Sequence, residues 1–406
     1  MRLLLIVISF MCLNPGNAQR LITDSVKKAE APKPSAKKWY DIINIGGYVQ
    51  VRYNRLLETN PKLKCDQCDK SIGEGGGFII RRGRIKISGN ITNNIYFYIQ
   101  PDFGSSVGSE QNVVQLRDAY IDIGFDKKNE YRLRIGQSKI PFGFENLQSS
   151  QNRLPLDRHD GLNSALKNER DLGAIFYWAP KAKRDLFSSL VRDNLKGSGD
   201  YGVFGFGVFN GQTANKQEEN NGLHTVARLS YPFKYKGQIF EPGIQAYAGK
   251  YSLPSSLRSA GVKAANDFVF NERRIATSLV LYPQPFGIQA EYNWGVGPQY
   301  NPSIDSIETK NLNGGYVTLS FRKTLKNGMV FFPFARFQQY EGGKKHEQDA
   351  RSYNVKEIES GIEWQISKAF EFTVSYVISE RRFEDSKTRT NLQKGNFLRL
   401  QGQVNF

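Results

Sequence analysis

Basic side chains recur at every second position in several segments of this sequence. In RRGRIKISGN, residues 81–90, Arg82, Arg84 and Lys86 alternate with glycine and isoleucine. Successive side chains of a β-strand point to opposite faces, so the three cations would share one polar face. A row of such groups presents N–H donors that suit phosphate or carboxylate, and the guanidinium groups present them in planar pairs. This spacing therefore indicates a surface that attracts small anions.

The same alternation surrounds other cations. Arg52 lies on the polar face of GYVQVRYN, and Arg132 and Arg134 lie on the polar face of YRLRIGQ. A charged residue on a lipid-facing surface near mid-bilayer costs about 2–4 kcal/mol, so these cations would point inward if the strands cross a membrane. Rings of Arg or Lys are the usual basis of anion selectivity in channels. We therefore expect six pore-lining cations: Arg52, Arg82, Arg84, Lys86, Arg132 and Arg134.

The elements that would carry these residues are long amphipathic strands. Segments such as IQAEYNWGVG and FEFTVSYVI alternate apolar and polar side chains, and about sixteen such segments occur, an even number as single-chain bacterial barrels require. Short turns such as 126–129 alternate with long polar insertions such as 210–222. The sequence therefore predicts an all-β fold: a transmembrane antiparallel β-barrel, of 16 strands as bacterial barrels allow, with short periplasmic turns and long extracellular loops.

A secreted soluble β-sandwich would alternate in the same way, and composition favours the barrel over it. The chain of 406 residues has 38 Gly, 27 Phe and 20 Tyr but only 3 Cys and 3 Met. Its mean hydropathy is −0.51, which a barrel tolerates because only every second residue of a membrane strand must be apolar. Abundant glycine and aromatic residues in a secreted chain are typical of the outer membrane.

The N-terminus predicts export. Arg2 precedes the apolar run LLLIVISFMCL, and Gly16-Asn17-Ala18 is a small-residue cleavage site, so we expect a signal peptide over 1–18. Residues 19–41 are rich in Lys, Ala and Pro and predict a flexible periplasmic segment. Residues 42–406 would then form the outer-membrane barrel.

The C-terminus also ends on an alternating strand, NFLRLQGQVNF. An open strand edge in lipid would leave backbone groups unsatisfied, so this strand must pair with the first one near Gly47. In that arrangement the odd-numbered residues of the last strand would line the interior. Phe406 is then the residue that completes the barrel.

Several of these motifs together resemble a known family. RRGRIKISG, QLRDAY and RIGQSKIPFGFENLQSS are similar to segments of the phosphate-selective porins O and P, and the likeness runs from Ile43 to Phe406. The resemblance implies sixteen-stranded anion channels that are usually homotrimers, with pores lined by arginine and lysine. It also implies that Phe406 is an outer-membrane assembly signal.

Residues 139–165 break the alternation, and long loops in compact barrels are often functional. In the resembled family the equivalent region folds into the pore and narrows it. Ser149-Ser150 match that region, and Asp157-Arg158 replace its acidic–basic pair. The candidate constriction cations are Lys139, Arg153 and Arg158.

Cys65 and Cys68 form one CxxC motif in the first long loop. A structural zinc site needs four ligands, and the sequence offers neither a second such pair nor a nearby histidine. An oxidising envelope favours a disulfide instead. We expect a Cys65–Cys68 disulfide, no metal and no cofactor.

The basic excess, with 56 Lys and Arg against 39 Asp and Glu, has two explanations. Outer-surface cations could pair with lipopolysaccharide phosphates, whereas cations in phase with the strands point to permeation. We predict an outer-membrane porin for small solutes that prefers anions such as phosphate. Interior acids such as Asp118 and Glu291 would make that preference mild. The alternative is a non-conducting barrel that serves as a subunit of an envelope assembly.

Two other classes fit poorly. A membrane-embedded hydrolase would need a Ser/His or Asp/His constellation, but the chain has only 3 histidines and none has a convincing partner in phase, so no enzyme is predicted. Nucleic-acid binding would need basic residues clustered on an exposed face, whereas these arginines alternate within strands.

Overall fold

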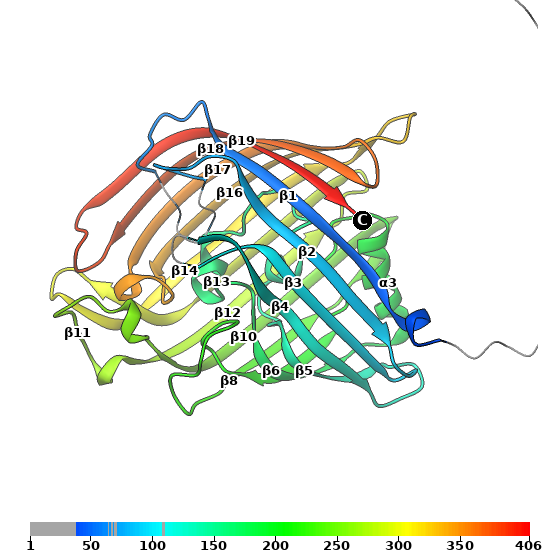
Figure 1. Ribbon diagram of the computed structural model, residues 1–406, viewed down its shortest axis with the longest axis horizontal. Coiled ribbons are helices and arrows are strands. Elements are labelled where there is room, and N and C mark those ends of the chain that lie inside the picture. Colours follow the sequence, from blue (N-terminus) through cyan, green and yellow to red (C-terminus); the bar gives the residue numbers. More distant parts are fainter. Residues whose placement is uncertain (1–37, 64, 66–67, 69–70, 108–109) are drawn as a thin grey trace, which may run out of the picture. The chain divides into compact units, whose positions relative to one another are not determined.

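The computed structural model describes residues 38–406, apart from 64, 66–67, 69–70 and 108–109. The predicted signal peptide over 1–18 and nearly all of the predicted segment 19–41 therefore lie outside the described residues. The unit Trp39–Phe406 is one antiparallel β-barrel (Figure 1).

Sixteen strands form the barrel wall, which confirms the predicted fold class. They are β1 (Asn44–Leu56), β2 (Ile79–Asn90), β3 (Ile95–Val107), β4 (Glu110–Gly124), β5 (Tyr131–Lys139), β6 (Arg170–Trp178), β7 (Phe204–Phe209), β8 (His224–Ser230), β10 (Gln238–Ser252), β12 (Val269–Leu281), β13 (Phe286–Asn301), β14 (Ser306–Phe321), β16 (Val330–Gly343), β17 (Ser352–Gln365), β18 (Phe370–Glu384) and β19 (Asn391–Asn405).

Three further short strands belong to this wall or to its loops. β9 (Phe233–Tyr235) and β8 both pair with β10, and β15 (Lys323–Thr324) and β14 both pair with β16, so β9 and β15 continue interrupted strands. β11 (Lys263–Ala264) lies in a loop and pairs in parallel with β14. The 3-10 helices are η1 (Trp39–Ile42), η2 (Ser255–Leu257), η3 (Asn266–Phe268) and η4 (Gln348–Ala350).

The first and last strands close the barrel. β1 pairs with β19 in an antiparallel register that sets Tyr48 opposite Asn405 and Arg52 opposite Gln401. Along β1, Gln50 is 1% exposed, whereas its neighbour Val51 is 44% exposed. The inner face is thus polar and the outer face apolar, which excludes a soluble sandwich, because a sandwich packs its apolar faces together.

One strand departs from simple alternation. In the β1–β2 register Gln50 faces Arg82 but Val51 faces Ile80, so Arg81 is the extra residue of a β-bulge. Simple alternation would put Ile79 on the outer face with Ile85. Because of the bulge, Ile79 instead sits opposite Arg52, on the inner side.

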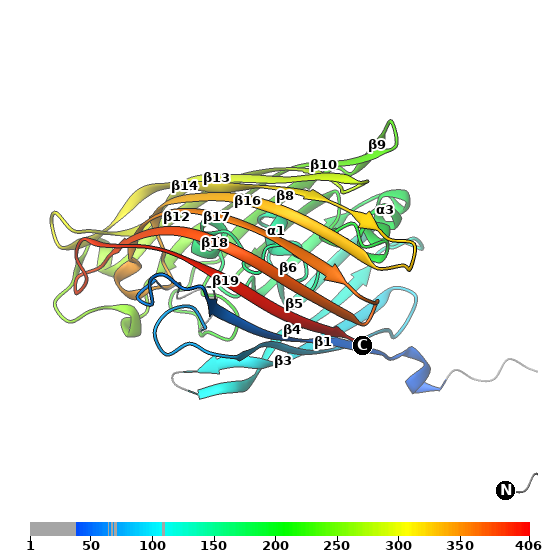
Figure 2. The ribbon, with the colours of Figure 1, turned by 90° about the horizontal axis from the view of Figure 1, so that it is seen from above.

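The barrel has two different ends. Short connections such as 91–94 and 366–369 lie at the end that also carries Phe406, which we call the turn end; the other is the loop end. From the loop end, residues 140–169 fold into the barrel (Figure 2). This inner loop contains α1 (Phe144–Leu147) and α2 (Asp160–Ala165), whose residues are all buried.

One connection at the turn end is long, unlike the short turns predicted there. Residues 179–203 join β6 to β7 and contain α3 (Lys181–Arg192). Its apolar side chains Phe187 and Leu190 are buried, and Leu190 packs in a cluster with Phe144 of the inner loop. No helix of the described part of the chain is both long enough and apolar enough to span a bilayer.

Candidate permeation path

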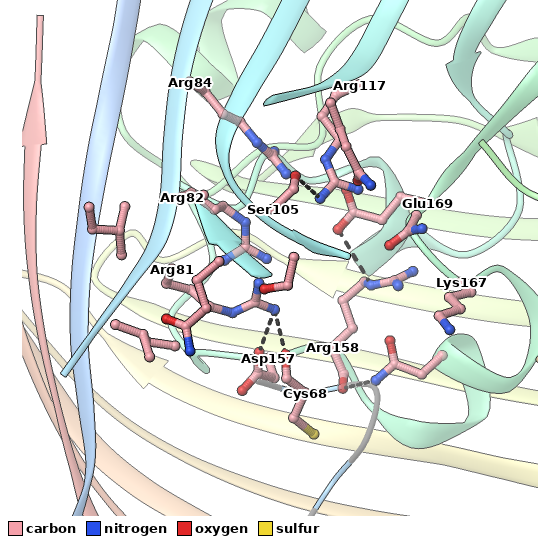
Figure 3. Close-up of a pocket in the computed structure, with 18 of the residues that line it drawn as sticks. Cys68, Arg81, Arg82, Arg84, Ser105, Arg117, Asp157, Arg158, Lys167 and Glu169 are labelled. Atoms are coloured by element: carbon pink, nitrogen blue, oxygen red, sulfur yellow. Dashed lines mark hydrogen bonds and ion pairs between the residues drawn. The ribbon is translucent and has the colours of Figure 1, made fainter. Parts of the chain in front are cut away.

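A cavity of about 420 Å³ opens between the inner loop and strands β2, β3 and β4 (Figure 3). Its charged lining is strongly basic, because eight cationic side chains face only two carboxylates. The basic residues are Arg81, Arg82, Arg84, Arg117, Arg153, Arg158, Lys167 and Lys216, and the acids are Asp157 and Glu169.

The predicted cations of β2 are arranged around this cavity in different ways. Arg84 Nε donates to Asp102 Oδ2 at 2.8 Å and its Nη1 donates to the Tyr48 hydroxyl at 2.9 Å. Arg82 Nη1 donates to Gln50 Oε1 at 3.0 Å, and Arg82 has no carboxylate partner within the described part of the chain. Arg82 is therefore the buried cation of β2 that is least neutralised.

Lys86 lies further along β2 and does not line this cavity. Its Nζ donates to Gln151 of the inner loop at 2.7 Å and stands 5.2 Å from the centre of the Tyr48 ring. It is half-buried, so water reaches its ammonium group more easily than the two arginines.

Arg132 and Arg134 line a second cavity, of about 390 Å³, near the turn end. Arg134 binds both carboxylate oxygens of Asp122, at 2.7 and 2.8 Å, and lies over the Tyr120 ring at 3.9 Å. Arg132 pairs with Asp200 at 2.8 Å. Both cavities thus lie against β2–β5, so predicted cations occur at two levels of the same wall.

Arg52 has a different position. It is 1% exposed, its Nη1 binds Asp157 of the inner loop at 3.1 Å, and its Nη2 donates to the Leu156 carbonyl at 2.9 Å. Arg52 lines neither of the two cavities. Its position suits a residue that holds the inner loop against β1.

The three candidate constriction cations meet at one carboxylate. Glu169 lies 3.1 Å from Arg153, 3.4 Å from Arg158 and 3.6 Å from Lys139. Arg153 and Arg158 line the loop-end cavity, whereas Lys139 Nζ also donates to three backbone carbonyls of the inner loop. Burial lowers the pKa of Arg158 to about 10, so it remains cationic at neutral pH.

The acidic–basic pair that the resemblance suggested at Asp157-Arg158 is not a contacting pair. Asp157 binds Arg52, Arg81 and Arg399 of the wall. The adjacent acid and base in contact are Glu169 and Arg170, at 2.5 Å. Of the two matching serines, Ser150 Oγ lies 2.6 Å from the Tyr48 hydroxyl.

Sequence reasoning missed two cavity arginines because both are bulge residues. Arg81 is the extra residue between Ile80 and Arg82, and Arg117 is the extra residue where the β3–β4 register shifts. Arg117 binds Asp102 at 3.2 Å and Ser105 at 3.0 Å. Strict alternation of inward and outward side chains assigns both arginines to the lipid face. Glu169 was also missed, although its charged run with Arg170 and Asp171 was a usable signal.

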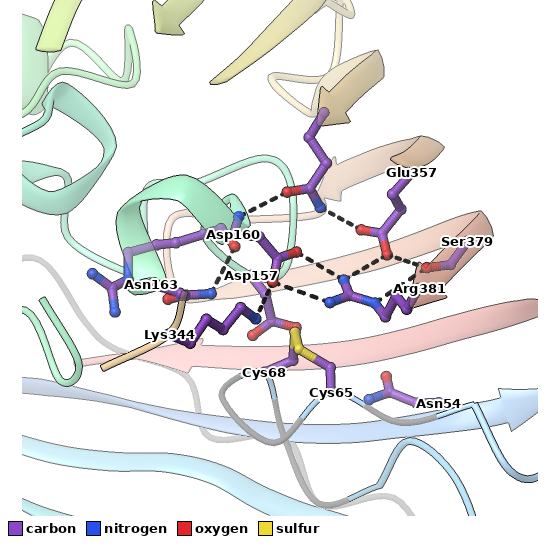
Figure 4. Close-up of a disulfide and its surroundings, with 12 residues drawn as sticks. Asn54, Cys65, Cys68, Asp157, Asp160, Asn163, Lys344, Glu357, Ser379 and Arg381 are labelled. Carbon is purple, nitrogen blue, oxygen red and sulfur yellow. Dashed lines mark hydrogen bonds and ion pairs between the residues drawn. A yellow bond between two sulfur atoms is a disulfide. The ribbon is translucent and has the colours of Figure 1, made fainter. Parts of the chain in front are cut away.

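The first long loop folds toward the same cavity. Cys65 and Cys68 form a disulfide with a Cα–Cα distance of 5.2 Å (Figure 4). The Cys68 carbonyl accepts a hydrogen bond from Arg81 at 2.6 Å, and Leu63 packs against Val377 and Phe397. In the described part of the chain, no group of three or more His, Cys, Asp or Glu could hold a metal ion.

A closed antiparallel barrel with an apolar exterior and a polar interior is typical of outer-membrane β-barrel proteins. Solved porins share this architecture. Residues 63–406 match the family described as phosphate-selective porin O and P, and the chain belongs to that family. The protein is accordingly a bacterial outer-membrane β-barrel.

Three solved structures illustrate the likeness, and each covers 90% of this chain. The outer membrane channel DcaP of Acinetobacter baumannii is 14% identical, with 97% of its chain covered and a TM-score of 0.57. An OmpF complex with daunomycin from Salmonella typhi is 13% identical, with 97% covered and a TM-score of 0.53. An anion-selective porin from Comamonas acidovorans is 9% identical, with 99% covered and a TM-score of 0.54. At these identities the likeness supports the fold alone. None of the curated proteins compared with the chain matches it.

Proposed function

We propose that this porin is a passive diffusion channel for small solutes with a preference for anions such as phosphate. The observation that carries this proposal is the loop-end cavity, where eight cations face two acids and Arg82 has no acidic partner in the described part of the chain. A narrow, low-dielectric site focuses the field of such charges and raises the local concentration of anions.

The opposite wall supports the same proposal by contrast. There the buried cations pair with buried acids: Arg336 with Glu359 at 3.2 Å, and Arg228 with Glu241 at 3.2 Å. Lys196 pairs in the same way with Glu363 at 2.5 Å. Along β2–β4, by contrast, Arg84 and Arg117 share one carboxylate, Asp102, and Arg82 has no carboxylate partner within the described residues; we propose this wall as the path of permeating anions. The acids Asp118 and Asp122 on that wall keep the preference mild.

The test is the reversal potential of single channels in a planar bilayer under a salt gradient, with chloride and then phosphate. The triple variant Arg82→Gln/Arg84→Gln/Lys86→Gln keeps side-chain length and polarity. We expect its reversal potential to move toward cation preference, and more at low salt because screening is weaker.

A matched control removes three cations from exposed positions outside the barrel wall, in Lys127→Gln/Lys128→Gln/Lys326→Gln. We expect this control to keep the wild-type reversal potential. If the two triple variants behave alike at low salt, the β2 cations do not control permeation and the anion preference is refuted.

One observation favours a second candidate function, a non-conducting barrel within an envelope assembly. The β6–β7 connection enters the turn end, where Lys196 contacts Glu363 and its carbonyl accepts a hydrogen bond from Gln148 of the inner loop at 2.6 Å. If the protein is a channel, it should show stepwise conductance in a planar bilayer. If folded protein shows no such conductance, the non-conducting barrel is favoured.

We also propose a homotrimer surrounded by outer-membrane lipid and lipopolysaccharide, as the family resemblance implies. Native mass spectrometry of the detergent-purified protein tests the stoichiometry. A monomer that conducts would remove the trimer from the proposal without affecting permeation.

A further inference from the structure

Glu169, at the end of the inner loop, is surrounded by positive charge. Its Oε1 lies 3.1 Å from Arg153 and 3.4 Å from Arg158, and its Oε2 lies 2.5 Å from Arg170 and 3.6 Å from Lys139. Burial raises the pKa of Glu169, but these four cations outweigh that effect and hold it well below its usual value. The carboxylate is therefore ionised at neutral pH.

This arrangement exceeds what a structural ion pair requires. One carboxylate cannot neutralise four cations, and among the described residues only Arg170 of the four has a second carboxylate partner, Asp118, at 2.9 Å. Arg153 is 5% exposed; its Nη1 lies 3.1 Å from Glu169 Oε1 without hydrogen-bond geometry, and its Nε has no hydrogen-bond partner in the described part of the chain. A buried guanidinium with unused donors has unmet capacity for an anion.

The cluster also borders the proposed path. Glu169, Arg153 and Arg158 line the same cavity as Arg82 and Arg117, and Figure 3 shows the ion pair between Arg158 and Glu169 at its edge. An anion that enters the cavity therefore meets cations that already hold a carboxylate.

The backbone at this point is unusual. Asn168 has φ 63° and Glu169 has φ 72°, in the left-handed region that residues other than glycine rarely adopt. Strained backbone of this kind persists where the surrounding structure requires a particular placement.

We propose that Glu169 is a tethered counter-anion that competes with permeating phosphate or carboxylate for the cations of the loop-end cavity. This inference rests on the proposed function. A channel must bind its solute strongly enough to admit it and weakly enough to release it. By occupying part of the site, Glu169 lowers the affinity and lets the bound anion leave.

The test measures inhibition of the chloride current by inorganic phosphate in single channels of the full-length protein. Glu169→Gln keeps the shape and removes the charge. We expect half-inhibition at about a tenfold lower phosphate concentration, because a unit charge a few ångströms away changes anion binding by at least that factor. At high phosphate the current should be smaller than in the wild type, since release is slower.

Glu363→Gln is the matched control, because Glu363 is also buried and paired with a lysine, Lys196, but lies outside the cavity. We expect its half-inhibition concentration to stay close to that of the wild type. An equal effect of both variants would indicate a general change in lumen charge and overturn the proposal.

If Glu169→Gln does not fold, Glu169→Gln in an Arg153→Gln background keeps the wild-type net charge. This double variant should bind phosphate more tightly than Arg153→Gln alone. If phosphate inhibition is unchanged or weaker after the Glu169 carboxylate is removed, Glu169 has only a structural role and does not compete with permeating anions. If the wild-type chloride current is insensitive to phosphate while the reversal potential still shows anion preference, the inference about Glu169 fails alone. If the reversal potential shows no anion preference, the proposed function fails and the inference fails with it.

Discussion

Arg82 and Arg84 are two residues apart on β2 but have different neighbours. Arg84 shares the buried carboxylate of Asp102 with Arg117, whereas Arg82 contacts the neutral side chain of Gln50. Removing one member of a buried ion pair leaves a charge uncompensated, whereas removing an unpaired buried cation relieves desolvation. The two arginines should therefore contribute to different properties of the protein.

We predict that Arg84→Gln destabilises the barrel by about 1–3 kcal/mol, because Asp102 keeps only Arg117 as its partner. Arg82→Gln should leave stability near the wild-type value and shift the reversal potential toward cations. Unfolding in guanidinium and single-channel recording measure the two effects. A larger loss of stability in Arg82→Gln than in Arg84→Gln would contradict this assignment.

At the scale of elements, the inner loop is held by buried acids. Glu145 binds Arg336 of β16 at 3.2 Å and His159 at 2.9 Å, and Asp160 binds Arg381 of β18 at 3.0 Å. Burial raises the pKa of Glu145, but the hydrogen bond from His159 and the charge of Arg336 outweigh it and lower the pKa to about 2. The folded pKa is thus below the ordinary value of 4.5.

A depressed carboxylate pKa stabilises the folded state above the unfolded pKa, and this stabilisation is lost as pH falls toward the folded pKa. We predict that the inner loop stays docked at pH 5 and above and loosens as the pH falls from about 4.5 to about 2. Hydrogen exchange of residues 140–169 measures this loosening. In Glu145→Gln the loop should already exchange faster at pH 6; protection equal to the wild type there would show that Glu145 does not hold it.

The strands and their closure could be predicted from the sequence because alternation is a local property of each segment. The bulges could not, since Arg81 and Arg117 take the inner side only through a register shift against a neighbouring strand. The α3 helix was missed because its window is rich in lysine and arginine. The three-residue spacing of the apolar residues Phe187 and Leu190, which is typical of one face of a helix, was the signal that could have predicted it.

The candidate site was predictable to a different degree. The alternation of side chains predicted the inner face for Arg82 and Arg134, and the family resemblance predicted a position in the pore for Arg153. Neither signal predicted which acids or amides these arginines contact. Which acid neutralises which cation depends on the path of the inner loop through the barrel. That path is set by contacts with strands that are far away in the sequence, such as the contact between Glu145 of the inner loop and Arg336 of β16.

At the scale of the whole molecule, the barrel is completed by its last residue. Phe406 N donates to Gly47 O at 3.1 Å, and Gly47 N donates to Phe406 O at 2.7 Å. We predict that Phe406→Ser lowers the amount of heat-modifiable barrel in the outer membrane while the precursor is still cleaved after Ala18. Electrophoresis of unheated and heated membranes measures the folded fraction, and unchanged levels would count against an assembly role.

Gly47→Ala tests the same closure from the other strand. A Cβ at Gly47 would lie 2.3 Å from the Arg84 carbonyl oxygen and 2.6 Å from the Phe406 ring, so the seam must shift at a cost of about 1–3 kcal/mol. Gly77→Ala is the control, because a Cβ there meets no atom within 4 Å. Equal barrel levels in the two variants would argue that the seam tolerates displacement.

The inner loop has one more consequence, which is mechanical. It leaves the wall at β5, returns at β6, and is tied across the barrel to β16 through Arg336 and to β1 through Arg52. The inner loop therefore connects opposite sides of the barrel wall through the barrel interior and resists a change in the distance between them. A hollow cylinder becomes oval under sideways load, whereas a braced one keeps its diameter. The width available to a solute in this barrel should thus be the same in a thin membrane as in a thick one.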